Sequence, residues 1–180
     1  TNLKTLKTSA DKLLVLINDI LDFNPLEAGQ LDLEEAAFSV KKLVNDIVNA
    51  NTNAANEREN RFSVFIDENI PDFFWGDSLR LGQVLNNLVS NAVKFTHKGF
   101  IDVNVSLKEL KSDTAIMEFY VQDTGVGIAK ENHKSIFSPF TQASTSITRQ
   151  YGGTGLGLAI TKKILGVLNS DIDVSSELGK

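Results

Sequence analysis

Apolar side chains recur along this chain at two different spacings, and each spacing predicts one kind of element. Strict alternation runs through residues 100–107: one face carries Ile101, Val103, Val105 and Leu107, and the other carries Asp102, Asn104 and Ser106. Such alternation predicts a strand in a sheet that has one buried face and one wetter face.

Further strands and several helices are predicted around that strand. We expect strands near 38–40 and over 61–66, 114–123 and 172–175, an extended connection over 70–75, and helices over 41–55, 78–95 and 156–168. Asp77 is the predicted N-cap of the second helix, because a carboxylate there accepts from free backbone N–H groups. Residues 136–153 have little regular pattern, which is typical of a functional or mobile loop.

The first 22 residues carry an apolar heptad seam, formed by Leu3, Leu6, Ala10, Leu13, Ile17 and Ile20. Neighbouring leucines widen the stripe, so a four-helix bundle fits it better than a two-stranded coil. The helix either packs on its own domain or forms a dimer contact. We favour the dimer contact, because the seam runs to the first residue and Pro25 then ends the helix. Residues 1–29 and 30–180 are the predicted domains.

Composition narrows the class of protein. The 180 residues suffice for one full domain with a helical appendage, and the 42% hydrophobic content is ordinary. The net charge of −5 argues against a nucleic-acid binder, and the absence of cysteine excludes disulfides and thiolate zinc sites. No apolar run reaches the length of a membrane span, and no signal peptide opens the chain. We expect a cytoplasmic fragment and leave open a membrane anchor of the parent protein.

Three polar or glycine-rich boxes carry the candidate chemistry, and the first lies on the helix that ends at Phe95. Its apolar seam is predicted to face the sheet and comprises Leu81, Leu85, Leu88, Ala92 and Phe95. Beside it lie Asn87, Asn91 and Lys94. Asparagine is a poor helix former, whereas amide oxygens suit magnesium and an ammonium group suits phosphate. A solvated helix face is the alternative, and Asn86 is expected to face solvent.

The second and third boxes place glycines at a strand end and at a helix start. Asp123 ends a predicted strand, where its carboxylate could accept a hydrogen bond from an exocyclic amine such as adenine N6; an ordinary Asp-Gly turn is the alternative. Residues 152–157 open a helix, whose free N–H groups favour anions. This box is neither a Walker loop, since no Gly-Lys-Ser/Thr follows, nor the dinucleotide fingerprint. It also differs from the glycine loop of eukaryotic-type kinases.

Taken in order, the boxes resemble the ATP-binding catalytic domain of bacterial sensor histidine kinases, in the superfamily that includes gyrase, MutL and heat-shock chaperone ATPases. The resemblance covers residues 38 to the end and rests on the segments Leu85–Phe95, Asp123–Ile128, Ile136–Phe140 and Tyr151–Leu158. It implies a two-layer α/β sandwich, with a mixed sheet and helices on one face, preceded by one long helix of a dimerisation hairpin.

The resemblance also implies a role for each box. Asn91 resembles the magnesium ligand, with Asn87 beside the same ion, and Lys94 resembles the phosphate contact. Phe95 is similar to the aromatic residue against adenine, and Asp123 to the carboxylate that binds its amine.

The remaining residues implied to contact the nucleotide belong to the glycine boxes and the loop. Around adenine these are Gly125, Gly127 and Ile128. Around the triphosphate they are Gly153, Thr154, Gly155, Leu156 and Gly157. The loop from Phe137 to Tyr151 resembles a lid over ATP, with Arg149 as a phosphate contact. Its Phe-Thr-Gln-Ala-Ser sequence is most similar to hybrid kinases, which carry a receiver domain.

Asn87 separates two reaction classes. ATP hydrolases of the superfamily have a glutamate at this position as the base for water, and an amide cannot take up a proton at neutral pH. The resemblance therefore implies phosphoryl transfer to a protein, in which the enzyme mainly positions groups and neutralises charge. A non-catalytic ATP-sensing module and an ATPase remain the alternatives.

The family transfers phosphate first to a histidine on a hairpin, and this chain has no residue in that context. His97 and His133 lie in polar segments and are expected to be exposed. Residues 1–29 resemble the second hairpin helix, so the acceptor is expected outside this fragment. The expected partners are the phosphoacceptor hairpin of the parent protein, a response-regulator receiver domain and, in the parent, a second copy. The chain also ends one strand short of the family pattern.

Overall fold

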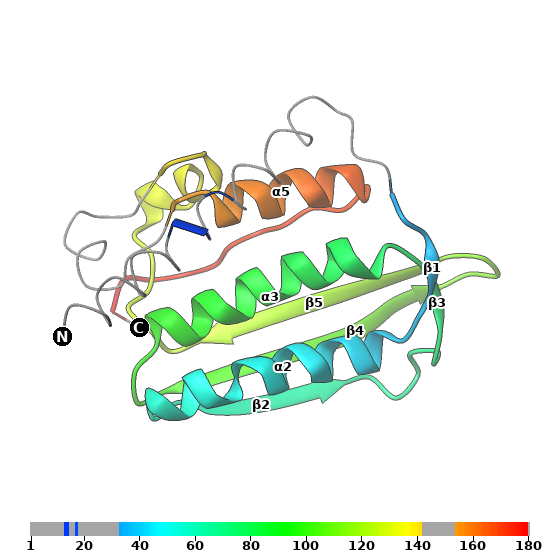
Figure 1. Ribbon diagram of the computed structural model, residues 1–180, viewed down its shortest axis with the longest axis horizontal. Helices are drawn as coiled ribbons and strands as arrows, with labels where there is room; N and C mark the ends of the chain where they lie inside the picture. Colours follow the sequence, from blue (N-terminus) through cyan, green and yellow to red (C-terminus); the bar gives the residue numbers. More distant parts are fainter. Residues whose placement is uncertain (1–12, 15–16, 18–32, 142–153, 180) are drawn as a thin grey trace. The chain divides into compact units, whose positions relative to one another are not determined.

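The computed structural model describes residues 13–14, 17, 33–141 and 154–179 (Figure 1). The chain divides into two compact units: Thr1–Asp32 with Glu131–Ser175, and Leu33–Lys130 with Ser176–Lys180. The predicted helix over 1–22 lies almost wholly outside the described residues. Among the described residues, no helix combines the length and the apolar character needed to cross a bilayer.

The second unit is built on a mixed sheet of three strands in the order β2-β4-β5. Strand β2 (Arg61–Ile66) runs parallel to β4 (Phe100–Leu110), and β5 (Ala115–Asp123) pairs with β4 in the antiparallel sense. A separate pair of strands joins β1 (Ala36–Phe38) to β3 (Phe74–Gly76). The predicted strands over 61–66, 100–107 and 114–123 are confirmed, and β3 forms within the predicted extended connection.

Two helices of equal length cover one face of this sheet (Figure 1). Helix α2 (Val40–Glu57) begins after Ser39, whose Oγ accepts from Lys42 N at 3.3 Å. Helix α3 (Ser78–Phe95) begins after Asp77, whose Oδ1 accepts from Arg80 N at 2.9 Å. The predicted N-cap and both helices are confirmed, and the arrangement is the expected two-layer sandwich.

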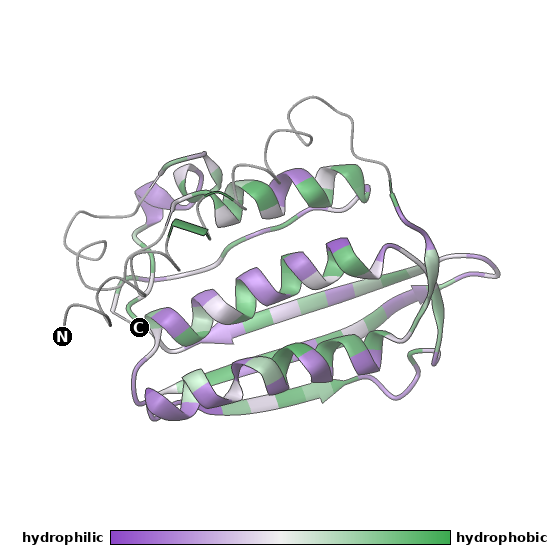
Figure 2. Cartoon of the chain, viewed as in Figure 1, coloured by the Kyte–Doolittle hydropathy of each residue, from purple (hydrophilic) through white to green (hydrophobic). Residues whose placement is uncertain are grey.

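The core lies between the helices and the sheet, with Ile101, Val103 and Val105 of β4 buried as their alternation predicted. Hydrophobic and hydrophilic segments alternate along α2 and α3 (Figure 2). The apolar seam predicted for α3 was partly wrong. Its buried residues are Val84, Leu85, Val89, Ala92 and Val93, whereas Leu81, Leu88 and Phe95 are only half-buried.

The shift of the α3 stripe has a physical cause in its neighbours. Val89 clusters with Val44, Ile47 and Val48 of α2, and Val93 clusters with Ala55 of the same helix. Because α3 must bury surface against α2 as well as the sheet, its buried arc turns toward α2. Asn86 is exposed, as predicted, and accepts from Asn51 Nδ2 of α2 at 3.1 Å.

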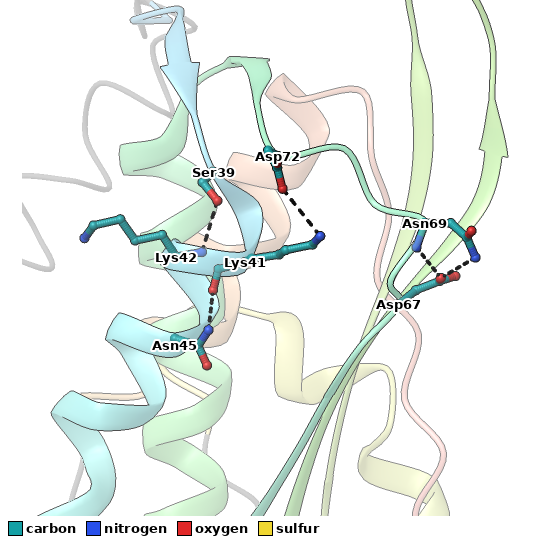
Figure 3. Close-up of polar contacts among 7 residues, drawn as sticks. All are labelled: Ser39, Lys41, Lys42, Asn45, Asp67, Asn69 and Asp72. Carbon is teal, nitrogen blue, oxygen red and sulfur yellow. Dashed lines mark hydrogen bonds and ion pairs between the residues drawn. The ribbon is translucent and has the colours of Figure 1, made fainter.

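Several polar contacts lie at the end of this unit where β2 ends (Figure 3). Lys41 pairs with Asp72 at 3.6 Å, and Asp67 Oδ1 accepts from both the backbone N and the side-chain Nδ2 of Asn69, at 2.9 and 2.8 Å. Hydrogen bonds from Asn69 lower the pKa of the Asp67 carboxyl below its ordinary value. The bond from the Asn69 backbone has the largest effect, and the bond from its side chain has the next largest.

The other unit contains helix α5 (Gly157–Val167), which packs against the short 3-10 helix η2 (Ser135–Phe137). A second 3-10 turn, η1 (Lys130–Asn132), spans the junction of the two units. The helix predicted over 156–168 is confirmed. The strand predicted over 172–175 was wrong: those residues do not form a strand, because they make no ladder hydrogen bonds with any other described residue.

Candidate functional site

The polar face of α3 carries the three residues that the sequence placed together. Asn87, Asn91 and Lys94 are all half-buried and occupy successive turns of the helix. Asn91 Nδ2 lies 3.4 Å from Asn87 Oδ1, to which it donates. Among the described residues nothing donates to Asn91 Oδ1, so this oxygen is available as a ligand atom. An amide pair of this kind can supply one or two hard oxygen ligands.

Lys94 provides a poorly solvated positive charge next to those oxygens. Partial burial is the main reason why the pKa of the Lys94 ammonium lies below its ordinary value. The positive charge of Arg58 lowers this pKa further. The Nζ atom lies 4.8 Å from the centroid of the Phe95 ring. Within the described ranges no carboxylate forms an ion pair with Lys94. An anion such as a phosphate would therefore offset the energetic cost of burying this positive charge.

Asp123 is brought to the C-terminal end of α3, although it belongs to β5. Its Oδ1 accepts from Gly125 N at 2.8 Å and from Thr96 Oγ1 at 3.3 Å. Val126 N donates to Phe95 O at 3.4 Å, which joins the Asp-Gly box to the end of the helix. No described residue donates to Asp123 Oδ2. The tertiary structure thus unites the asparagine helix and the first glycine box, as the sequence predicted.

The two glycines after Asp123 are required for different reasons. A Cβ at Gly125 would lie 2.5 Å from Phe95 O, so only glycine lets the turn approach the helix end so closely. Gly127 has a φ of +69°, and a Cβ there would lie 2.0 Å from Glu177 O. Ile128 N donates to Ser176 Oγ, and Gly179 N to Val126 O, both at 2.9 Å. Residues 176–179 therefore hold the box, a role that the sequence analysis missed.

The last glycine box and the phenylalanine box belong to the other unit. Phe137 is half-buried, with Lys162 Nζ 5.3 Å from its ring centroid, and Phe140 N donates to Gly155 O at 3.0 Å. Leu156 is fully buried, and its N–H donates to Thr154 Oγ1 at 3.2 Å. Gly157 begins α5, one residue after the predicted start. Arg149 and Gly153 lie outside the described residues.

Two buried polar residues beside the site were also missed. Asn60 and Thr96 are each almost completely buried; Thr96 begins the segment that links α3 to β4, and Asn60 bonds to that segment at Thr96 and Gly99. A polar residue directly after the amphipathic helix was the only sequence signal. His97 is exposed, as expected, whereas His133 is half-buried because it lines a cleft with Phe137 and Lys162.

Metal-binding clusters of the histidine or carboxylate type do not occur here: the described part of the chain has no group of three or more such residues. The chemistry of the donor set at Asn87 and Asn91 nevertheless fits magnesium. That ion needs only one or two protein oxygens when water and phosphates complete its shell.

Comparison with known proteins places this arrangement in a family. The family described as "Histidine kinase-, DNA gyrase B-, and HSP90-like ATPase" matches residues 76–180. The signal transduction histidine-protein kinase BarA of Escherichia coli is 39% identical over 176 residues, which are 98% of this chain and 19% of BarA. The sensor histidine kinase GacS of Pseudomonas protegens is 39% identical over 178 residues, or 99% of this chain and 19% of GacS.

Solved structures show the same relationship. The crystal structure of full-length ShkA in complex with AMPPNP matches with a TM-score of 0.83 and 31% identity, over 99% of this chain and 36% of ShkA. The histidine kinase AdeS of Acinetobacter baumannii matches with a TM-score of 0.75 and 25% identity, over 98% of this chain and 78% of AdeS. The chain spans only about a fifth of the curated relatives BarA and GacS, at 19% of each.

The match over residues 76–180 includes the asparagine helix and both glycine boxes. The chain therefore belongs to the family described as "Histidine kinase-, DNA gyrase B-, and HSP90-like ATPase".

Proposed function

We propose that this chain binds ATP together with magnesium and transfers the γ-phosphate to a histidine that lies outside the fragment. The observation that carries the proposal is the convergence at one end of α3. Three groups lie there: the amide oxygen of Asn91, to which no described residue donates, the half-buried ammonium of Lys94 and the carboxylate of Asp123. They belong to α3 and β5, and the hydrogen bond from Val126 N to Phe95 O links the ends of these two elements. In this order, these groups suit a metal ion, a phosphate group and a purine base.

Adenine recognition is assigned to Asp123. Its Oδ1 already accepts two hydrogen bonds, so Oδ2 is the atom that would accept from the exocyclic amine. Gly125 and Gly127 present bare backbone at two positions of the turn, and Phe95 and Ile128 would supply apolar contacts to the ring.

Magnesium binding is assigned to Asn91 and Asn87, whose amide oxygens fit that ion. When bound, the ion neutralises charge on the phosphate oxygens. Lys94 adds a second positive charge for the same phosphates, and its partial burial strengthens the attraction because little water screens it.

Transfer rather than hydrolysis is assigned from Asn87. Its amide cannot remove a proton from water at neutral pH, so the site lacks the base that hydrolysis needs at this position. The protein then orients the nucleotide and holds its charge while the imidazole of the acceptor attacks the γ-phosphorus and ADP leaves. The competing functions are an ATPase, which would release free phosphate steadily, and a pure ATP sensor, which would bind ATP without labelling a histidine.

The remaining assignments rest on the family resemblance. Phe137 and Arg149 are assigned to the lid, and the box from Gly153 to Gly157 to the triphosphate. Leu156 N–H already serves Thr154, so the N–H groups of Gly155 and Gly157 are the better candidates for phosphate. We assign residues 1–29 to half of a dimerisation hairpin and 30–180 to the catalytic domain. The parent protein would dimerise and pass the phosphate to a receiver domain, with a membrane anchor left open.

Phosphoryl transfer in trans tests the proposal. The chain is mixed with γ-labelled ATP, magnesium and the phosphoacceptor hairpin of the parent protein. We expect acid-labile label on a histidine, with little free phosphate released. ATP binding without labelled histidine would favour the sensor, and steady phosphate release would favour the ATPase.

The assignment of adenine to Asp123 is tested by measuring the dissociation constant of ATP for Asp123→Ala. Loss of a hydrogen bond to a charged group costs about 1.5–3 kcal/mol, or roughly 10-fold to 150-fold in ATP affinity. Gln122→Ala is the matched control, because its side chain is exposed on the neighbouring position of the same strand and should leave ATP affinity unchanged. Equal affinity of the two variants for ATP would refute the assignment of adenine to Asp123.

A further inference from the structure

A buried hydroxyl lies directly behind the carboxylate of Asp123. Thr96, the residue after α3, is fully buried, and its Oγ1 donates to Asp123 Oδ1 at 3.3 Å. Gly125 N donates to the same oxygen at 2.8 Å. Asp123 itself is exposed, so its carboxylate would rotate freely without such bonds. The two donors on one oxygen select a single orientation and leave Oδ2 without a donor among the described residues.

The backbone of Thr96 is held in place from two sides. Thr96 N donates to Ala92 O at 3.1 Å, which closes the last turn of the helix. Asn60 Nδ2 donates to Thr96 O at 3.0 Å, and Asn60 Oδ1 accepts from Gly99 N at 3.2 Å. Asn60 is only 4% exposed, so water does not compete for these bonds. The hydroxyl is therefore presented from a fixed support.

The side chain of Thr96 is also restrained by packing. A Cβ at Gly99 would lie 2.7 Å from Thr96 Cγ2, which shows how closely that backbone covers the methyl group. Threonine is stiff at χ1, because two heavy atoms branch at its Cβ. With the methyl packed against Gly99, the hydroxyl stays directed at Asp123.

We propose that Thr96 is a positioning residue for base selection: it orients Asp123 so that Oδ2 accepts from an amino group on the purine. This inference rests on the proposed function, since it concerns the same nucleotide site. Thr96 does not touch the nucleotide itself. Its effect should therefore fall on the preference for an amino purine over an oxo purine and leave contacts with the phosphates unchanged.

The test measures dissociation constants of ATP and inosine triphosphate, in magnesium buffer, by titration calorimetry on the full chain and on Thr96 variants. Inosine triphosphate carries an oxygen in place of the 6-amino group, so it lacks the donor that the proposal assigns to Asp123. Thr96→Val keeps the branched shape and removes only the hydroxyl. We expect it to weaken ATP about tenfold, with inosine triphosphate unchanged. Thr96→Ser, which keeps the hydroxyl, should restore ATP affinity to within about threefold of the native chain.

A merely structural role of Thr96 predicts a different pattern. Equal weakening of both nucleotides by Thr96→Val, or an unchanged preference for ATP, would overturn the inference while leaving the proposed function intact. If the native chain binds neither nucleotide, the proposed function itself fails. Thermal melting confirms that each variant is folded. Should Thr96→Val melt below the assay temperature, Thr96→Ala removes the same hydroxyl and is judged by the same ratio.

Discussion

Gly127 is the position at which a single added methyl group should damage this domain most. Its φ of +69° lies in the left-handed region, and a Cβ would meet Glu177 O at 2.0 Å and Glu177 C at 2.8 Å. Both obstructing atoms belong to the backbone, so no side-chain rotation can relieve the contact. Gly127→Ala must therefore either distort the turn or push residues 176–179 away from it.

The expected loss of stability has two contributions, which are the strained backbone at residue 127 and the hydrogen bonds that are broken. An alanine in the left-handed conformation costs about 1–2 kcal/mol. Moving residues 176–179 would break the bonds from Ile128 N to Ser176 Oγ and from Gly179 N to Val126 O. Each such bond contributes about 0.5–1.5 kcal/mol. We expect the free energy of unfolding to fall by roughly 2–5 kcal/mol.

Urea unfolding followed by far-UV circular dichroism measures this loss, with Gly76→Ala as the matched control. A Cβ at Gly76 would meet Phe38 Cε1 at 3.6 Å, an ordinary van der Waals distance, in the same unit of the chain. The control should stay within about 0.5 kcal/mol of the native chain. Equal stability of Gly127→Ala and the native chain, or equal losses in both variants, would refute the steric reasoning.

Two further predictions concern pH. Burial lowers the pKa of Lys94, so the folded state bears a cost at neutral pH that disappears as pH rises through the depressed pKa toward the ordinary value of 10.5. The melting temperature of Lys94→Met relative to the native chain should therefore decline between pH 7 and that value; a constant difference would contradict this. The lowered pKa of Asp67 gives stability that is present above its ordinary value of 3.8 and lost as pH falls through the depressed pKa. Asp67→Asn should melt below the native chain at neutral pH and match it in strong acid, and a gap that persists in acid would count against this origin.

Local sequence signals were sufficient for most elements of the fold. The apolar periodicity and the Asp77 cap defined α3 to the residue, because a cap bond such as that to Arg80 N joins positions three apart. Alternation likewise predicted β4, in which Ile101, Val103 and Val105 are buried as expected, whereas Leu107 is only half-buried. The order of the polar boxes was enough to identify a nucleotide site, since each box combines residue types that a helix start or a strand end presents to a ligand.

Contacts between distant segments could not be read in the same way. The sequence does not indicate that α2 turns the buried stripe of α3 toward Val89 and Val93, because that burial depends on a neighbour. It also does not indicate that residues 172–175 fail to form a strand, since a strand requires a ladder partner as well as alternation.

The sequence by itself therefore determined which residues could serve a nucleotide, and the tertiary structure decided how they are held. Asn87, Asn91, Lys94 and Asp123 stand in recognisable motifs, so the sequence was enough to propose roles for them. Thr96 binds Asp123 across 27 positions, and Ser176 binds Ile128 across 48. Such bonds have no local signature, because they exist only when folding brings Thr96 to Asp123, at 3.3 Å, and Ser176 to Ile128, at 2.9 Å.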